Sequence, residues 1–154
     1  MIEILFENVA RDRLDDSVRM LLSNSVLSSV VASESPDMDL DSWKGRVLEI
    51  LEDAAPSPGA ISFSLDKVEL GGVTIVSPLI QVFMVNEVVD ISLSFLDCDL
   101  ICDVSVSLDA LHHASLDYLR LTGGIHVICG YEPASDQKTR FFTDSVRGPL
   151  LGFW

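Results

Sequence analysis

Three closely spaced aspartates are the residues of this sequence that most resemble a chemical site. Asp97, Asp99 and Asp103 lie within "DCDLICD", so on a strand their carboxylates point to the same side. Such an oxygen cluster can contact a divalent cation, but a calcium loop also needs a glycine turn and backbone ligands. Neither accompanies these aspartates. We therefore expect no metal ion and no other cofactor.

The potential nucleophiles and bases form no catalytic pattern. Alternation places Cys98 and Cys102 on a buried side, and with Cys129 the count is odd, which argues against a disulfide framework and for reduced thiols in a cytoplasmic protein. His112 and His113 are adjacent on an expected helix and point about 100° apart, so they cannot chelate one ion together. The sequence has no serine elbow, phosphate-binding loop, HExxH or CxxC motif. It favours a protein that is not an enzyme, although a site assembled from scattered residues stays an alternative.

The charge is strongly negative and unevenly distributed. The chain has 24 acidic and 10 basic residues, a net charge of −14, which disfavours nucleic acid and anionic membranes and attracts basic partners. No lysine or arginine lies between Lys67 and Arg120, an interval that contains eight acidic residues: Glu69, Glu87, Asp90, Asp97, Asp99, Asp103, Asp109 and Asp117. The alternative is that the charge only keeps an apolar chain soluble.

Helical periodicity appears in three segments. Apolar spacing predicts helices over Arg11–Val31, from Asp39 or Asp41 to the "APSPG" stop at Ala55–Gly59, and over Leu108–Leu121 before Gly123-Gly124. The second helix presents an apolar stripe, namely Leu40, Trp43, Val47, Ile50, Leu51 and Ala54.

Two-residue alternation indicates the strands. "ISFSL" at Ile61, "ISLSF" at Ile91 and "VSVSL" at Val104 alternate apolar residues with serine, Leu79–Val85 is nearly continuously apolar, and "GIHVIC" forms a later strand. The 154 residues suit one domain spanning 1–154. We predict an α+β fold with a mainly antiparallel sheet of about five or six strands and helices packed on one face. The start lacks a basic region, and polar residues interrupt the longest apolar stretch, so we expect no signal peptide and no membrane span.

A hairpin over Val88–Leu108, turning near Leu96–Cys98, would align the acidic residues. Alternation then places Asp90, Asp97, Asp99 and Asp103 on one outward face, with Glu87 at its edge. Like charges paired across a sheet are unfavourable, so the face is either simply solvated or a docking face for a cationic partner.

The most polar window of the C-terminal half is "GYEPASDQKTRFFT", Gly130–Thr143. Arg140 stands between Asp136 and Asp144 and is expected to contact a carboxylate, while Phe141-Phe142 anchors the loop to the core. The loop is either structural or part of a binding surface.

The segment Leu108–Thr143 resembles the end of some immunity proteins of bacterial polymorphic toxin systems. The match rests on Glu132-Pro133-Ala134, Asp136, Thr139-Arg140 and Phe142. The resemblance implies a cytoplasmic protein that binds and neutralises a cognate toxin, one that in such systems is often a basic nuclease, without catalysis of its own. The alternative is an acidic secretion chaperone that binds an effector segment; the oligomeric state stays open for both. The candidate partner-binding residues are acidic: Glu87, Asp90, Asp97, Asp99, Asp103, Glu132 and Asp136.

Overall fold

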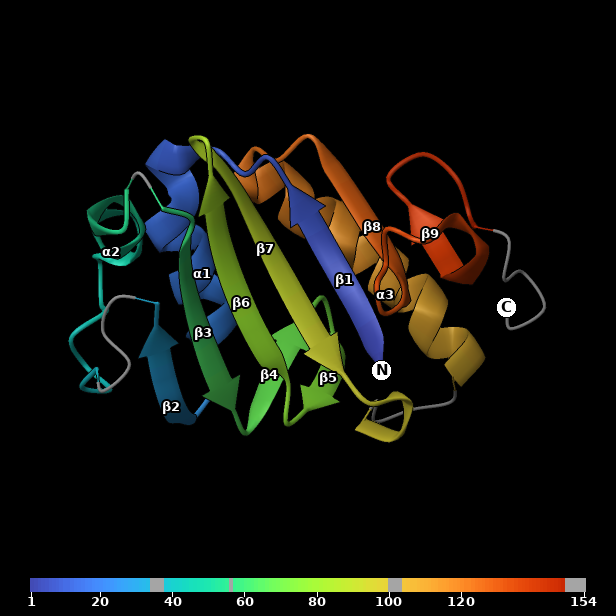
Figure 1. Cartoon of the computed structure of the whole chain (residues 1–154). Helices are drawn as coiled ribbons and strands as arrows, with labels where there is room; N and C mark the ends of the chain where they lie inside the picture. Colours follow the sequence, from blue (N-terminus) through green and yellow to red (C-terminus); the bar gives the residue numbers. More distant parts are fainter. Residues whose placement is uncertain (34–37, 56, 100–103, 149–154) are drawn as a thin grey trace.

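The computed structural model describes residues 1–33, 38–55, 57–99 and 104–148. Its main feature is a seven-stranded sheet in which every pair of neighbours is antiparallel. The order across the sheet is β2-β3-β6-β7-β1-β8-β9 (Figure 1). The strands are β1 (Ile2–Glu7), β2 (Leu27–Ala32), β3 (Gly59–Leu65), β6 (Leu79–Val85), β7 (Val88–Phe95), β8 (His126–Tyr131) and β9 (Arg140–Thr143).

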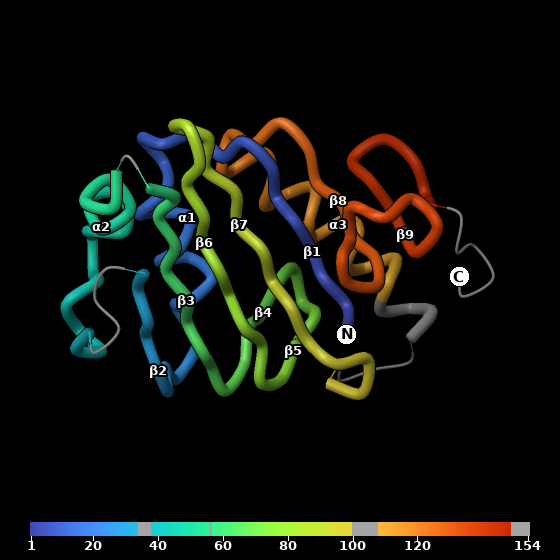
Figure 2. Tube along the Cα trace, in the orientation of Figure 1, coloured from blue at the N-terminus to red at the C-terminus, as the bar shows by residue number. Residues whose placement is uncertain are grey.

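Helices and a short hairpin cover one face of this sheet. They are α1 (Leu14–Leu22), α2 (Val47–Asp53), α3 (Val104–Thr122) and the pair β4 (Lys67–Leu70) and β5 (Val73–Val76). Figures 1 and 2 show α1, α3 and the hairpin behind the sheet and α2 beside β3. The described residues also form three short 3-10 helices, namely η1 (Arg11–Arg13), η2 (Asp97–Asp99) and η3 (Gln137–Thr139). The predicted α+β class and the mainly antiparallel sheet are confirmed.

The core lies between the sheet and the helical layer. Ile2, Ile4 and Phe6 of β1 point into it and are at most 2% exposed, because alternate residues of a strand share one face. The Phe6 ring meets Tyr118 of α3 edge to face, with 4.8 Å between centroids. The first strand of the chain is thus an interior strand of the sheet, and it lies between β7 and β8.

Tyr118 joins the two principal helices through one buried hydrogen bond. Its hydroxyl donates to the Ser17 carbonyl of α1 at 2.9 Å, and burial raises the pKa of Tyr118 far above its usual value. Tyr118→Phe should lower the unfolding free energy by about 1 kcal/mol, because an intramolecular hydrogen bond contributes roughly that much and the carbonyl stays buried. Urea unfolding monitored by circular dichroism measures the change. A variant as stable as the unsubstituted chain would contradict this assignment.

Several sequence predictions of helices are wrong at their boundaries. The helix expected over Arg11–Val31 ends at Leu22, and the chain then forms β2, which pairs with β3 and turns Val30 and Ala32 into the core. The second helix begins at Val47, with no side-chain cap at Arg46, and not at Asp39 or Asp41. The strands β1, β2 and β9 were not expected; together with the expected strands β3, β6, β7 and β8 they make up the seven-stranded sheet.

The expected strand at "VSVSL" is a helix. The α3 helix begins at Val104, so the hairpin predicted over Val88–Leu108 has only its first strand, β7. After Phe95 the chain makes the η2 turn, and 100–103 lie outside the described residues. Leu108, Leu111, Ser115, Tyr118 and Thr122 are buried at spacings of three and four, so a helical stripe continues where alternation had indicated a strand.

The register of β7 is as predicted, but its second face is also covered. Ile91 and Phe95 point into the core, whereas Ser92 and Ser94 point outward and are nevertheless only 1% and 4% exposed.

The described helices include none long and apolar enough to cross a membrane. Cys129 is buried, but Cys98, predicted to be buried, is exposed; both are free thiols, and Cys102 lies outside the described residues.

Candidate partner-binding surface

The acidic residues expected on one hairpin face lie at opposite ends of the sheet. Asp90 stands near the β6–β7 turn, whereas Asp97 and Asp99 are in η2, beyond the other end of β7. The rise of about 3.3 Å per residue separates Asp90 from Asp97 by roughly 20 Å. The prediction of a single acidic face is therefore wrong, because the second strand of the hairpin, which was expected to carry Asp97, Asp99 and Asp103, does not form. Asp103 itself lies outside the described residues.

The carboxylates of β7 and η2 take part in local structure. Asp90 accepts a hydrogen bond from the Asn8 backbone at 2.8 Å, and Asp99 accepts one from the Leu96 backbone at 3.3 Å. Asp97 accepts from the Tyr131 hydroxyl at 3.1 Å; partial burial and this hydrogen bond raise the pKa of Tyr131. Replacing these carboxylates would disturb turns as well as change charge.

The side chains of Glu87 and Glu132 take less part in local structure than the carboxylates of β7 and η2. Glu87 forms the β6–β7 turn with Asn86, both at positive φ as a two-residue type I′ turn requires, and lies 3.7 Å from the Arg11 guanidinium. The Glu132 side chain makes no ion pair or hydrogen bond with another described residue. These two acids are therefore the ones most available to a partner among the candidates.

The Gly130–Thr143 segment folds onto the outer face of the sheet. Glu3 of β1 accepts hydrogen bonds from the Ser92 hydroxyl and from the Ala134 backbone, both at 2.8 Å. Ala134 is fully buried, and this contact explains why the outward side of β7 is covered here.

Arg140 holds the same loop, but through different partners from those predicted. Its guanidinium donates to the Ala134 and Ser135 carbonyls at 3.3 and 2.9 Å, and not to Asp136 or Asp144. Asp136 instead accepts from the Lys138 backbone at 3.0 Å and caps η3. Phe141 and Phe142 are buried as predicted. The contacts show a loop held in place by its own polar groups and by Glu3.

A groove that the sequence did not indicate lies at the β2 edge of the sheet. It consists of two hollows of about 380 and 390 Å3, both lined by Leu22, Trp43 and Lys44. We call this the Trp43 groove. Its further lining comes from four segments of the chain and includes Ser25, Leu27, Leu40, Asp41 and Leu65 in one hollow and Arg19, Ser23 and Gly45 in the other.

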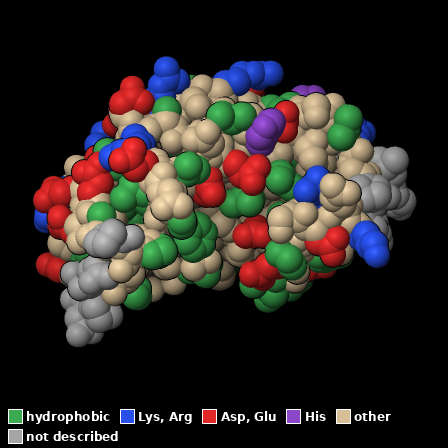
Figure 3. All heavy atoms as spheres, turned by 45° about the horizontal axis from the view of Figure 1, so that its top comes forward, with side chains coloured by type: hydrophobic (Ala, Val, Ile, Leu, Met, Phe, Trp, Pro, Cys, Tyr) green, Lys and Arg blue, Asp and Glu red, His purple; other side chains and the backbone are tan. Residues whose placement is uncertain are grey.

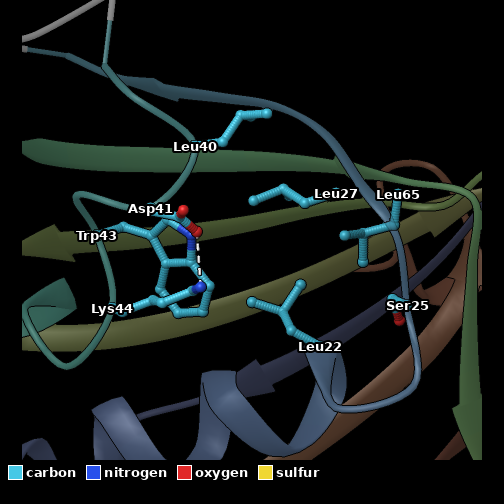
Figure 4. A pocket seen from close by; sticks show the side chains of 8 residues that line it. All are labelled: Leu22, Ser25, Leu27, Leu40, Asp41, Trp43, Lys44 and Leu65. Carbon is cyan, nitrogen blue, oxygen red and sulfur yellow. Dashed lines mark ion pairs between the residues drawn. The ribbon is translucent and has the colours of Figure 1, made fainter.

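The indole of Trp43 packs against the core on one side, and its nitrogen-bearing edge faces charged side chains. The residue is 5% exposed, and its ring meets Phe63 of β3 edge to face at 5.1 Å. Its Nε1–H is buried and has no hydrogen-bond acceptor among the residues that the structure describes. Figure 4 shows the nitrogen-bearing edge facing the Asp41–Lys44 ion pair, across the hollow from Leu22 and Leu65.

The groove has a charged rim. Lys44 pairs with Asp41 at 2.6 Å and Arg19 with Asp16 at 2.9 Å, and all four side chains are more than 60% exposed. Asp39 is exposed and makes no ion pair with another described residue. Figure 3 shows acidic side chains gathered at the end of the molecule near α2, with apolar side chains between them. Leu40, expected to face the core, is 42% exposed beside this rim.

The histidines of the described residues have different hydrogen-bond partners. His112 lies against Phe142, and its ring nitrogen is 2.9 Å from the Thr143 carbonyl, where burial lowers the pKa of His112. His126 is exposed and 3.3 Å from Asp144. In the part of the chain that the structure describes, no three histidine, cysteine, aspartate or glutamate side chains are grouped to hold a metal ion.

Comparison with known proteins identifies the family. The structure is similar to a chain in a crystal structure of the toxic C-terminal tip of CdiA from Pseudomonas aeruginosa in complex with immune protein. The TM-score is 0.78 at 24% sequence identity, over 97% of each chain, which shows that the fold is shared. No curated protein sequence matches this chain. The family model for the PABL017 Cdi1I immunity protein matches residues 1–147, and the chain belongs to that family.

Proposed function

We propose that this protein binds the toxic C-terminal tip of a CdiA-type protein and neutralises it, without catalysing a reaction itself. The match of the family model to residues 1–147 carries the proposal, because it spans nearly the whole chain and both structural layers. The similar solved chain comes from a complex of a CdiA tip with immune protein, which supports the same kind of partner. These observations favour immunity over the secretion chaperone.

The partner is a basic, nuclease-like domain that meets this protein in the cytoplasm. A net charge of −14 attracts a cationic protein from a distance and repels nucleic acid, so it speeds encounter with a basic toxin and keeps nucleic acid away from the interface. The free thiols of Cys98 and Cys129 suit a reducing compartment. The acidic candidates Glu87, Asp90, Asp97, Asp99, Asp103, Glu132 and Asp136 contribute to this field from several surfaces.

Expression of the toxin tip in a bacterial host tests the function directly. The probe is the C-terminal tip of the cognate CdiA-type protein. We expect the tip alone to stop growth, and co-expression of this protein to restore it, because a tight complex blocks the tip. The purified proteins should form a complex whose association slows as salt is raised. A tip that stays toxic beside folded, soluble immunity protein would refute the proposal.

A further inference from the structure

We propose that the Trp43 groove receives an apolar side chain of the toxin tip, flanked on the tip by lysine or arginine. In the complex, an oxygen of the tip accepts the Trp43 Nε1 hydrogen bond. The inference rests on the proposed function and adds where the partner docks and what chemistry it presents.

The unpartnered indole nitrogen is the first observation. A buried N–H without an acceptor lowers the stability of the free protein, so native structures rarely leave one. Trp43 is held by its edge-to-face contact with Phe63, and its Nε1 is closed off from solvent. An arriving acceptor, such as a backbone carbonyl of the tip, would satisfy this donor, and the complex would gain a hydrogen bond that the free protein lacks.

The cover over that nitrogen is easily displaced. In Figure 4 the Asp41–Lys44 ion pair faces the nitrogen-bearing edge of the indole. The Lys44 and Asp41 side chains are 64% and 78% exposed, and an exposed pair of this kind contributes little to stability. A cation of the tip can therefore take over Asp41, while Lys44 swings away and opens the path to Nε1.

The walls of the groove select the residue that enters. Leu22, Leu27 and Leu65 line the hollow of about 380 Å3 together with Ser25 and the Asp41–Lys44 pair, so it offers apolar walls to an aliphatic or aromatic side chain and charged groups to the residues beside it. Leu40 and Val26, 42% and 69% exposed, extend apolar surface beside it. Asp41 lines the hollow, and Asp39, which has no ion-pair partner among the described residues, directly precedes Leu40 of the lining, so basic residues beside the inserted side chain are complementary in charge.

Two variants separate docking from core packing. Trp43→Phe keeps an aromatic ring against Phe63 but removes the N–H, so affinity for the purified tip should fall about three- to tenfold. Leu40→Lys places a positive charge beside the hollow, where it repels the basic residues of the tip, and should weaken binding more than tenfold. A tryptophan that only fills the core would show the opposite pattern, a lower unfolding midpoint with unchanged affinity.

Val146→Lys is the matched control. Val146 is 59% exposed and lies next to β9, at the opposite edge of the sheet from the groove. It should bind the tip as the unsubstituted protein does, as measured by calorimetric titration with circular dichroism as the folding test. Folded Trp43→Phe and Leu40→Lys variants that bind normally would overturn the docking site and leave the proposed function intact. If the unsubstituted protein does not bind the tip, the proposed function fails first.

Discussion

Phe63→Ala is expected to lower the free energy of unfolding by about 3–5 kcal/mol, because truncating a buried phenylalanine removes transfer free energy and leaves a cavity. Phe63 is fully buried on the core face of β3, where its ring supports Trp43. The loss should appear as a lower midpoint of urea unfolding with little change in slope. Affinity for the toxin tip should fall as well, since Trp43 would lose the contact that fixes its ring.

Phe83→Ala is the control for this prediction. Phe83 lies on the neighbouring strand β6, on the opposite face of the sheet, and is half-buried. Its truncation should lower the unfolding free energy by only about half as much, because a half-buried ring loses less buried apolar area than a fully buried one. Equal losses at the two positions would mean that the outer face of the sheet is packed as tightly as the core.

Two of the predicted strands, β3 and β7, share a property that β1 and β2 lack in part. In β3 and β7, serine marks every second position, so the period of two is visible over five residues. In β1, Leu5 stands at an outward position between Glu3 and Glu7, and it weakens the contrast between the faces. Val26, directly before β2, continued the apolar spacing of α1, so the predicted helix was extended across the turn. Pairing with β3 decides that segment, and a pairing partner is not visible in local periodicity.

The error at "VSVSL" arose from the same limit. Alternating valine and serine have strand propensity, but the segment is continuous with the helical stripe that starts at Leu108. Propensity is a weak determinant against tertiary packing, and the longer helix prevailed. This one change removed the hairpin and with it the single acidic face on which Asp97, Asp99 and Asp103 were to lie beside Asp90.

The Trp43 groove was beyond reach for a different reason. Trp43 was correctly expected to point inward, but the groove exists because α1, the start of β2, the 40–45 turn and the end of β3 converge on that residue. No spacing rule connects Leu22, Leu40 and Leu65. The missing acceptor for the indole nitrogen is likewise a property of the folded chain, since the donor becomes buried only when those segments meet.

Reversing Asp39 and Asp41 together to lysine should slow association with the toxin tip by about tenfold at low salt. Asp41 lines the Trp43 groove and is the carboxylate from which a tip cation would displace Lys44, and Asp39 directly precedes Leu40 of the lining. The reduction should shrink at high salt, because screening removes the attraction in both proteins. Stopped-flow mixing at two ionic strengths measures the rates.

The comparison that decides the surface is a second double reversal, Glu87→Lys with Glu132→Lys. Each double variant changes the net charge by the same four units, from −14 to −10, so a difference between them reports position and not total charge. Glu87 is in the β6–β7 turn and Glu132 follows β8, and neither lines the groove. Equal slowing would indicate steering by the whole protein field. An encounter that begins at the groove depends most on the charges beside it, so the reversals of Asp39 and Asp41 should slow association more than those of Glu87 and Glu132. If only the reversals of Glu87 and Glu132 slow association, the contact lies instead at the acidic candidates at the ends of the sheet.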